Sequence, residues 1–61
     1  MNIQGKVFVV TGGASGLGAA TATYLIAQGA KVIMVDMNHE LGKEMQKHLG
    51  EHSHFIQLDV T

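Results

Sequence analysis

Apolar residues follow two patterns along the chain: nearly continuous runs, and positions spaced three or four apart. The runs cover residues 6–11 and 31–36 and are rich in β-branched side chains. This composition favours strands, and continuous rather than alternating apolar residues are typical of parallel strands covered on both faces. Residues 54–59 form a third segment of similar character. The pattern therefore predicts three strands.

The segment from about residue 16 to residue 28 has helical spacing. Its predicted inward stripe consists of Leu17, Ala20, Tyr24 and Ala27, widened by Leu25 and Ile26. Gly29 stands where a C-cap glycine belongs. We therefore expect a first helix that packs through this stripe and ends just before Gly29.

A second helix is predicted between the second and third strands. Leu41, Met45 and Leu49 are four residues apart and mark one face of it. Asn38 is suited to the N-cap position, and Gly50 is expected to end the helix.

Strands that alternate with helices predict an α/β fold with a parallel sheet. In a Rossmann-type half of a doubly wound sheet, three strands lie in the order 3-2-1 and both helices cover the same face. The 61 residues would supply one such β-α-β-α-β half. The other face would expose an apolar patch of roughly a few hundred Å², which soluble monomers seldom do. We therefore expect the fold to be incomplete, with more protein covering that face.

The segment that joins the first strand to the first helix carries the most chemical information. It reads Thr-Gly-Gly-Ala-Ser-Gly-Leu-Gly, residues 11–18. Free backbone N–H groups and the helix dipole at such a junction can bind a pyrophosphate. Glycines allow positive φ and close approach of phosphates, while Ser15 can add a hydroxyl and Gly18 would let the helix pack close to the strand. The turn is therefore a candidate phosphate-binding site.

Other glycine-rich motifs do not match this turn. The G-x-G-x-x-G dinucleotide pattern is absent, Ala19 replaces the lysine of a nucleoside-triphosphate loop, and Leu17 stands where a hydrolase elbow needs glycine. What remains is T-G-x-x-x-G-x-G. Glycine-rich strand-to-helix turns also occur without a ligand, so the turn alone leaves nucleotide binding and a purely structural role both open.

The position of Asp36 favours nucleotide binding over a purely structural role of the turn. It ends the second strand, 18 residues after Gly18, close to the spacing of about 20 expected for the acid that holds the adenosine ribose. A carboxylate there would accept hydrogen bonds from both ribose hydroxyls of NAD. It would also repel the 2′-phosphate of NADP, by about 4 kcal/mol for unit charges about 4 Å apart at an effective dielectric near 20. We therefore predict a preference for NAD over NADP. The alternative is that Asp36 is only a polar residue at the end of a strand and binds no ligand.

Asp59 and Val60 follow the third predicted strand at the same edge of the sheet. Ligands of open α/β sheets bind outside the carboxyl ends of the strands. Asp59 could accept a hydrogen bond from the adenine amino group while the Val60 N–H donates to the ring. An aspartate that only makes a turn is an equal alternative.

Charge and composition argue against several other functions. The net charge is −1, with four lysines and no arginine, which disfavours binding to nucleic acid or to an anionic membrane. Cysteine is absent, so thiolate metal sites are excluded. The four histidines are expected to be surface residues rather than metal ligands. No signal peptide or membrane span is recognisable, and we expect a cytoplasmic protein.

Together these residues resemble the short-chain dehydrogenase/reductase family. Residues 11–18 match its TGxxxGxG motif, Asp36 matches the acid of NAD-preferring members, and residues 59–60 match its pattern after the third strand. The sequence of the glycine turn, followed by a strand that ends in Asp36, is most similar to the 3-hydroxyacyl-CoA dehydrogenase type 2 subgroup. The resemblance implies NAD as the cofactor, bound by Gly12, Ser15, Gly16, Leu17, Gly18, Asp36, Met37, Asp59 and Val60.

The same resemblance implies that catalysis needs residues outside this chain. The family's catalytic serine, its tyrosine and lysine four apart, and its structural asparagine have no counterpart here. Tyr24 is the only tyrosine, Gln28 follows it at four, and Ser15 belongs to the turn. No catalytic residue is therefore assigned.

Residues 1–61 are expected to form the N-terminal part of one NAD-binding Rossmann domain. The full-length protein would transfer hydride between NAD and an alcohol or ketone, with 3-hydroxyacyl-CoA as one candidate substrate. It would also form a homo-oligomer, as family members commonly do. The alternative is a stand-alone nucleotide-binding or regulatory module without catalysis.

Overall fold

The computed structural model describes residues 3–12, 14 and 16–58. Its elements alternate as predicted: β1 (Val7–Thr11), α1 (Gly16–Ala27), β2 (Lys31–Asp36), α2 (His39–Leu49) and β3 (Ser53–Gln57). The third strand starts one residue before the predicted segment 54–59 and ends at Gln57, because its pairing with β2 runs only as far as Asp36. Neither helix in the described part of the chain is long and apolar enough to span a membrane.

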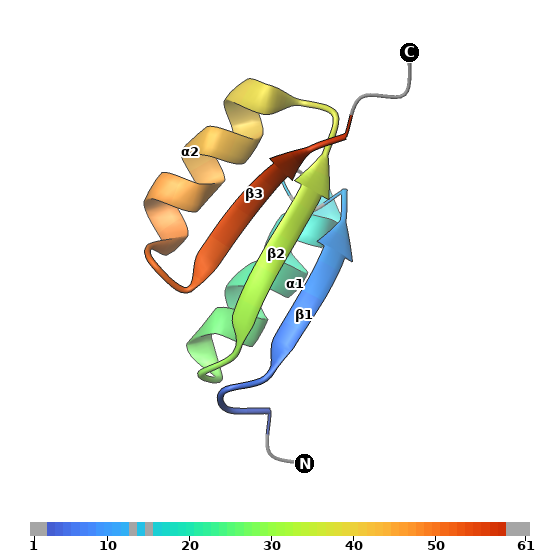
Figure 1. Ribbon diagram of the computed structural model, residues 1–61. Helices are drawn as coiled ribbons and strands as arrows, with labels where there is room; N and C mark the ends of the chain where they lie inside the picture. The colour runs from blue at the N-terminus through green and yellow to red at the C-terminus, as the bar shows by residue number, and fades with distance from the viewer. Residues whose placement is uncertain (1–2, 13, 15, 59–61) are drawn as a thin grey trace.

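The three strands form one parallel sheet in the order β1-β2-β3, with β2 in the middle (Figure 1). This is the predicted order 3-2-1. Phe8 pairs with Val32, and Val32 pairs with Ser53. All three arrows point to the same end of the sheet (Figure 1), so the carboxyl ends of the strands lie along one edge. This confirms the Rossmann-type β-α-β-α-β arrangement.

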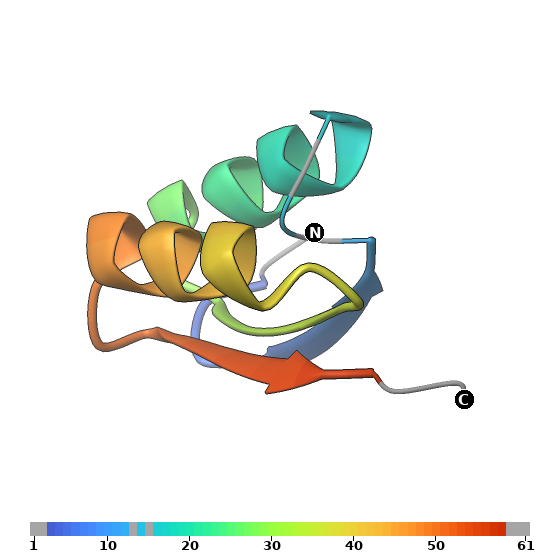
Figure 2. The same cartoon turned by 90° about the horizontal axis from the view of Figure 1, so that it is seen from above.

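Both helices cover the same face of the sheet (Figure 2). Val32, Met34 and Phe55 point into the space below the helices and form the core with Ala22. On the opposite face the outer strands expose Val7, Val9 and Ile56, with Val9 64% accessible to solvent, while Ile33 and Val35 of β2 are half-buried. The bare apolar face that the strand pattern predicts is therefore present.

The predicted stripe of α1 is wrong at its four principal residues, but its widening by Leu25 and Ile26 is confirmed, because both pack against the core. Leu17 and Tyr24 are 85% and 62% exposed, and Ala20 and Ala27 are exposed as well. The helix packs instead through Ala22, which is 0% exposed, and through the flanking residues Gly18, Ala19, Leu25 and Ile26, which are half-buried. The helix is apolar on nearly every side, so spacing could not select the face. Small side chains occupy the contact because they let the helix approach the strands closely.

The C-terminus of α1 has the predicted glycine cap. Gly29 has φ +89°, a conformation that residues with a Cβ rarely adopt. Its N–H donates to the Ile26 carbonyl at 3.0 Å, and the Ala30 N–H donates to the Leu25 carbonyl at 3.0 Å. These two bonds are those of a Schellman motif, and they turn the chain directly into β2.

Helix α2 also has its predicted ends. The Asn38 side chain accepts a hydrogen bond from the Leu41 N–H at 3.0 Å, and Gly50 is the C-cap. Met45 and Leu49 pack against the core, whereas Leu41 is 40% exposed and lies at the margin of the predicted face.

A glycine inside α2 brings the helix close to β3. Gly42 is buried, and a Cβ added there would fall on the ring of Phe55. The position therefore requires the absence of a side chain, a constraint that the hydrophobic pattern did not reveal.

The outer edge of β3 is covered by groups from α2. The Phe55 N–H donates to Oε1 of Gln46 at 3.1 Å. The Ser53 N–H donates to the Gly50 carbonyl at 3.1 Å, and the Ser53 hydroxyl donates to the same oxygen at 2.8 Å. An edge strand whose N–H groups are already paired is a poor template for a further strand.

Candidate nucleotide-binding site

The candidate site lies at the turn that connects β1 to α1. The Gly12 N–H donates to the Val35 carbonyl at 2.7 Å, which ties the start of the turn to β2. Gly12 and Gly16 have φ +66° and +54°, so the prediction that the turn needs positive φ is confirmed at both. A Cβ built at either glycine would meet nothing within 4 Å. The backbone is therefore open to an approaching group at these two positions.

The first turn of α1 consists of Gly16, Leu17 and Gly18 and contains no acidic residue. Backbone N–H groups at the start of a helix have no partner within the helix, and the helix dipole makes this end positive. An anion is therefore favoured here, and no side chain of the first turn opposes it.

Asp36 ends β2 beside this turn and is half-buried. Its two carboxylate oxygens have separate backbone donors. The Ala14 N–H donates to Oδ2 at 3.1 Å, and the Asn38 N–H donates to Oδ1 at 2.9 Å. The carboxylate thus bridges the glycine turn and the start of α2, with its orientation fixed from both sides.

These contacts keep the carboxylate ionised. The Asn38 N–H lowers the pKa of Asp36 most, partial burial raises it, and the backbone N–H groups of Ala14 and Met37 lower it further. The balance lies below the ordinary aspartate value of 3.8, because hydrogen bonds to the anionic form outweigh its desolvation.

The end of β3 supports the loop that follows Asp36. The Leu58 N–H donates to the Asp36 carbonyl at 2.9 Å, and the Gln57 side chain donates to the Met37 carbonyl at 3.4 Å. Met37 itself is 61% exposed, so it is not part of the core. It follows Asp36 directly, so an apolar side chain is accessible to solvent just after the end of β2.

The predicted site residues fall into two groups. Gly12, Gly16, Leu17, Gly18, Asp36 and Met37 are described, and they come from the ends of β1 and β2 and the start of α1. Ser15, Asp59 and Val60 lie outside the described residues. Sequence reasoning missed the contributions of Ala14 and Asn38, because both act through backbone N–H groups that any residue except proline carries.

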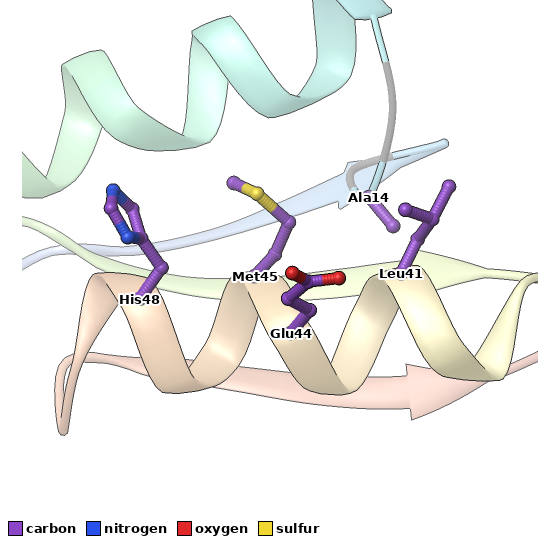
Figure 3. A pocket seen from close by; sticks show the side chains of 5 residues that line it. All are labelled: Ala14, Leu41, Glu44, Met45 and His48. Carbon is purple, nitrogen blue, oxygen red and sulfur yellow. The ribbon is translucent and has the colours of Figure 1, made fainter.

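A groove of 370 Å³ runs along α2 from the glycine turn (Figure 3). It is lined by Ala14, Leu41, Glu44, Met45 and His48. Figure 3 shows the four α2 side chains in a row, with Ala14 at the Leu41 end.

The histidines do not form a metal site within the described residues. All four of them are exposed, as predicted. No cluster of three or more histidine, cysteine, aspartate or glutamate side chains suited to a metal ion occurs in residues 3–12, 14 and 16–58.

Comparison with known proteins connects this geometry to a family. The family model described as short chain dehydrogenase matches residues 6–61. The chain is 51% identical over 59 residues to 3-hydroxyacyl-CoA dehydrogenase type-2 of Drosophila melanogaster, covering 97% of this chain and 23% of that protein. It is 46% identical over 59 residues to 3-beta-hydroxysteroid dehydrogenase of Comamonas testosteroni, with the same 97% and 23% coverage.

A solved structure shows the same arrangement of elements. Serine dehydrogenase from Escherichia coli superimposes with a TM-score of 0.82 at 35% identity, over 88% of this chain and 25% of that one. The chain therefore spans about a quarter of the length of these proteins. On the family match and these identities, the chain belongs to the short-chain dehydrogenase family.

Proposed function

We propose that residues 1–61 are the N-terminal part of one Rossmann domain and bind NAD for a short-chain dehydrogenase/reductase. One observation carries the proposal. The ionised Asp36 carboxylate lies beside a positive-φ glycine turn at the carboxyl ends of the strands, and the Ala14 N–H in that turn is hydrogen-bonded to it. The proposal is supported because a helix end that favours an anion adjoins a carboxylate that can accept hydrogen bonds from hydroxyls.

The chain's residues fit the two polar parts of an adenine dinucleotide. Gly12 and Gly16 leave open space along the turn, and the N–H groups of the α1 first turn, including Leu17 and Gly18, would donate to the pyrophosphate. Ser15 would add its hydroxyl.

The adenosine end of NAD would be held by residues that follow β2 and β3. Each Asp36 oxygen accepts one backbone N–H and retains a lone pair for a ribose hydroxyl. Met37 would flank the adenine, with Asp59 and Val60 as further contacts to its edge.

NAD, when bound, supplies the hydride acceptor of a dehydrogenase. The residues of this chain bind and orient it, and no group here is assigned to proton transfer. We propose that the whole protein oxidises or reduces an alcohol or ketone. The names of relatives that act on 3-hydroxyacyl-CoA or a 3-beta-hydroxysteroid support that substrate class.

The proposal is tested by titrating the full-length protein with NAD and NADP. Repulsion of about 4 kcal/mol between Asp36 and a 2′-phosphate is reduced by solvent, so we expect NAD to bind at least about tenfold more tightly, which is about 1.4 kcal/mol. Asp36→Asn should reduce this preference. Glu40→Gln is the matched control, because it removes the same charge from the exposed first turn of α2. Equal affinities for NAD and NADP in the unaltered protein would refute the preference.

Whether the whole protein is an enzyme is tested separately, by assaying the intact protein. Oxidation of a secondary alcohol with NAD would support the dehydrogenase. Tight NAD binding without any such oxidation would favour a nucleotide-binding module that has no catalytic function.

A further inference from the structure

We propose that Asp36 has a second role: its carboxylate positions the phosphate-binding turn, so that the ribose and pyrophosphate sites are energetically coupled through the bond from the Ala14 N–H to Oδ2. This inference rests on the proposed NAD site. It goes beyond ribose recognition, because it makes Asp36 a positioning residue for phosphates that its side chain does not touch.

The hydrogen bond from Ala14 links two segments that are far apart in sequence. Ala14 and Asp36 are separated by 22 positions, and the N···O distance is 3.1 Å. Ala14 is only 4% exposed, so water cannot readily replace the carboxylate as acceptor. A bond from an N–H to an anion is stronger than one to a neutral acceptor, and leaving a buried N–H unpaired is costly. The Asp36 carboxylate therefore holds the backbone of Ala14 in the turn.

Two acceptors are needed at this position, for a reason independent of the ribose. The Ala14 N–H points to one carboxylate oxygen and the Asn38 N–H to the other. Asparagine has one amide oxygen and one NH₂ group, so it can satisfy only one of these donors. Asp36→Asn should therefore release one of the two donors and weaken the bond to the other, because a neutral amide oxygen is a poorer acceptor than a carboxylate. The hold on Ala14 is reduced in either case, while the size of the side chain is conserved.

The charge of Asp36 and its positioning role have opposite effects on phosphate binding. A carboxylate near a phosphate repels it, so charge alone predicts that Asp36→Asn strengthens binding of a phosphorylated ligand relative to its unphosphorylated form. A loosened turn predicts the reverse, because its N–H groups would have to be ordered when the phosphate binds. The direction in which Asp36→Asn changes the affinity for the phosphorylated ligand, relative to the unphosphorylated one, distinguishes the two effects.

The experiment measures the dissociation constants of adenosine and ADP for the full-length protein, the Asp36→Asn variant and the Glu40→Gln control. Both ligands contain the ribose, so loss of ribose contacts weakens them equally. We expect the ratio of the adenosine constant to the ADP constant to fall by about tenfold or more in Asp36→Asn and to stay unchanged in Glu40→Gln. An unchanged or increased ratio in Asp36→Asn overturns the inference while leaving the proposed function intact. No binding of ADP or adenosine by the unaltered protein overturns the proposed function itself.

A second measurement, made without a ligand, tests the hydrogen bond from the Ala14 N–H to Asp36. In the ligand-free protein, Asp36→Asn should accelerate hydrogen exchange of the Ala14 amide by at least about tenfold relative to core amides such as that of Met34, since exchange requires opening of the bond. Glu40→Gln should leave it unchanged. An unaltered Ala14 exchange rate in Asp36→Asn would show that the carboxylate does not hold the turn.

Discussion

Asp36 combines a position fixed by two backbone donors with a depressed pKa, and the proposed preference for NAD depends on its charge. Its pKa lies below 3.8 in the folded chain, chiefly because the Asn38 N–H donates to it. A depressed pKa means that the ionised carboxylate contributes stability above the unfolded-state pKa, and that this contribution is lost as the pH falls through the folded-state value. We predict that the Ala14 and Asn38 amide resonances shift together in an acid titration, with a midpoint below 3.8.

Asp36→Asn is the control for that titration, because it removes the titrating group without changing its size. The joint transition should disappear in the variant, and both amides should then be insensitive to pH in the same range. Midpoints at or above 3.8 would mean that the backbone donors do not stabilise the anion.

At the level of single residues, the sequence predicted the side chains but not the backbone partners. Gly12 and Gly16 were predictable because positive φ restricts the residue type, and Asp36 because its spacing from the turn is characteristic. The donor at Ala14 was not, since every non-proline residue has the same N–H. The acid proposed to bind the ribose could therefore be identified from the sequence, whereas its hydrogen bond to the turn could not.

Helix α2 offers the sharpest test at the level of an element. Gly42→Ala would place a Cβ on the Phe55 ring. Overpacking typically costs about 1–3 kcal/mol, against a gain in helix propensity of about 1 kcal/mol. We expect a net decrease in the free energy of unfolding in urea.

Two variants make the Gly42 result interpretable. Lys43→Ala, on the exposed side of the same helix, should change stability by less than about 0.5 kcal/mol. If the ring causes the loss, Gly42→Ala should cost less in a Phe55→Leu background than in the unaltered protein. A more stable Gly42→Ala variant would show that helix propensity outweighs the close approach to β3.

The two helices show when an element's orientation is predictable. Helix α2 has a polar side, so the inward positions of Met45 and Leu49 could be predicted. Helix α1 is apolar almost all round, and the sheet selects the face with Ala22 over the face with Leu17 and Tyr24. Packing of small residues decided this, a factor that apolar spacing does not measure.

For the whole molecule, the two sheet edges differ. Gln46 and Gly50 accept hydrogen bonds from the N–H groups of Phe55 and Ser53 on the outer edge of β3. Strand β1, in contrast, has β2 as its only strand partner among the described residues. A sheet that grows would therefore add strands beside β1. The relatives are about four times as long as this chain, which covers 23% of them, and they have the length to supply such strands.

The sheet face opposite the helices gives one prediction. The expected effect of a charge on that face differs between the full-length protein and the isolated chain. Val9 is 64% exposed on that face, and in the full-length protein we expect it to be buried. Val9→Lys should then destabilise the full-length protein by about 3 kcal/mol or more, because a charge would be taken out of water. In the isolated 61-residue chain the same change should reduce self-association, since it interrupts an apolar patch.

Gln28→Lys supplies the matched control, because it adds the same charge at an exposed position after α1 and should change neither property. Unfolding in urea measures the first effect and sedimentation velocity the second. If the full-length protein tolerated Val9→Lys as well as Gln28→Lys, the face would be in water there too. The sheet would then carry helices on one face only and would not be doubly wound, because only a covering layer makes a lysine at this position costly.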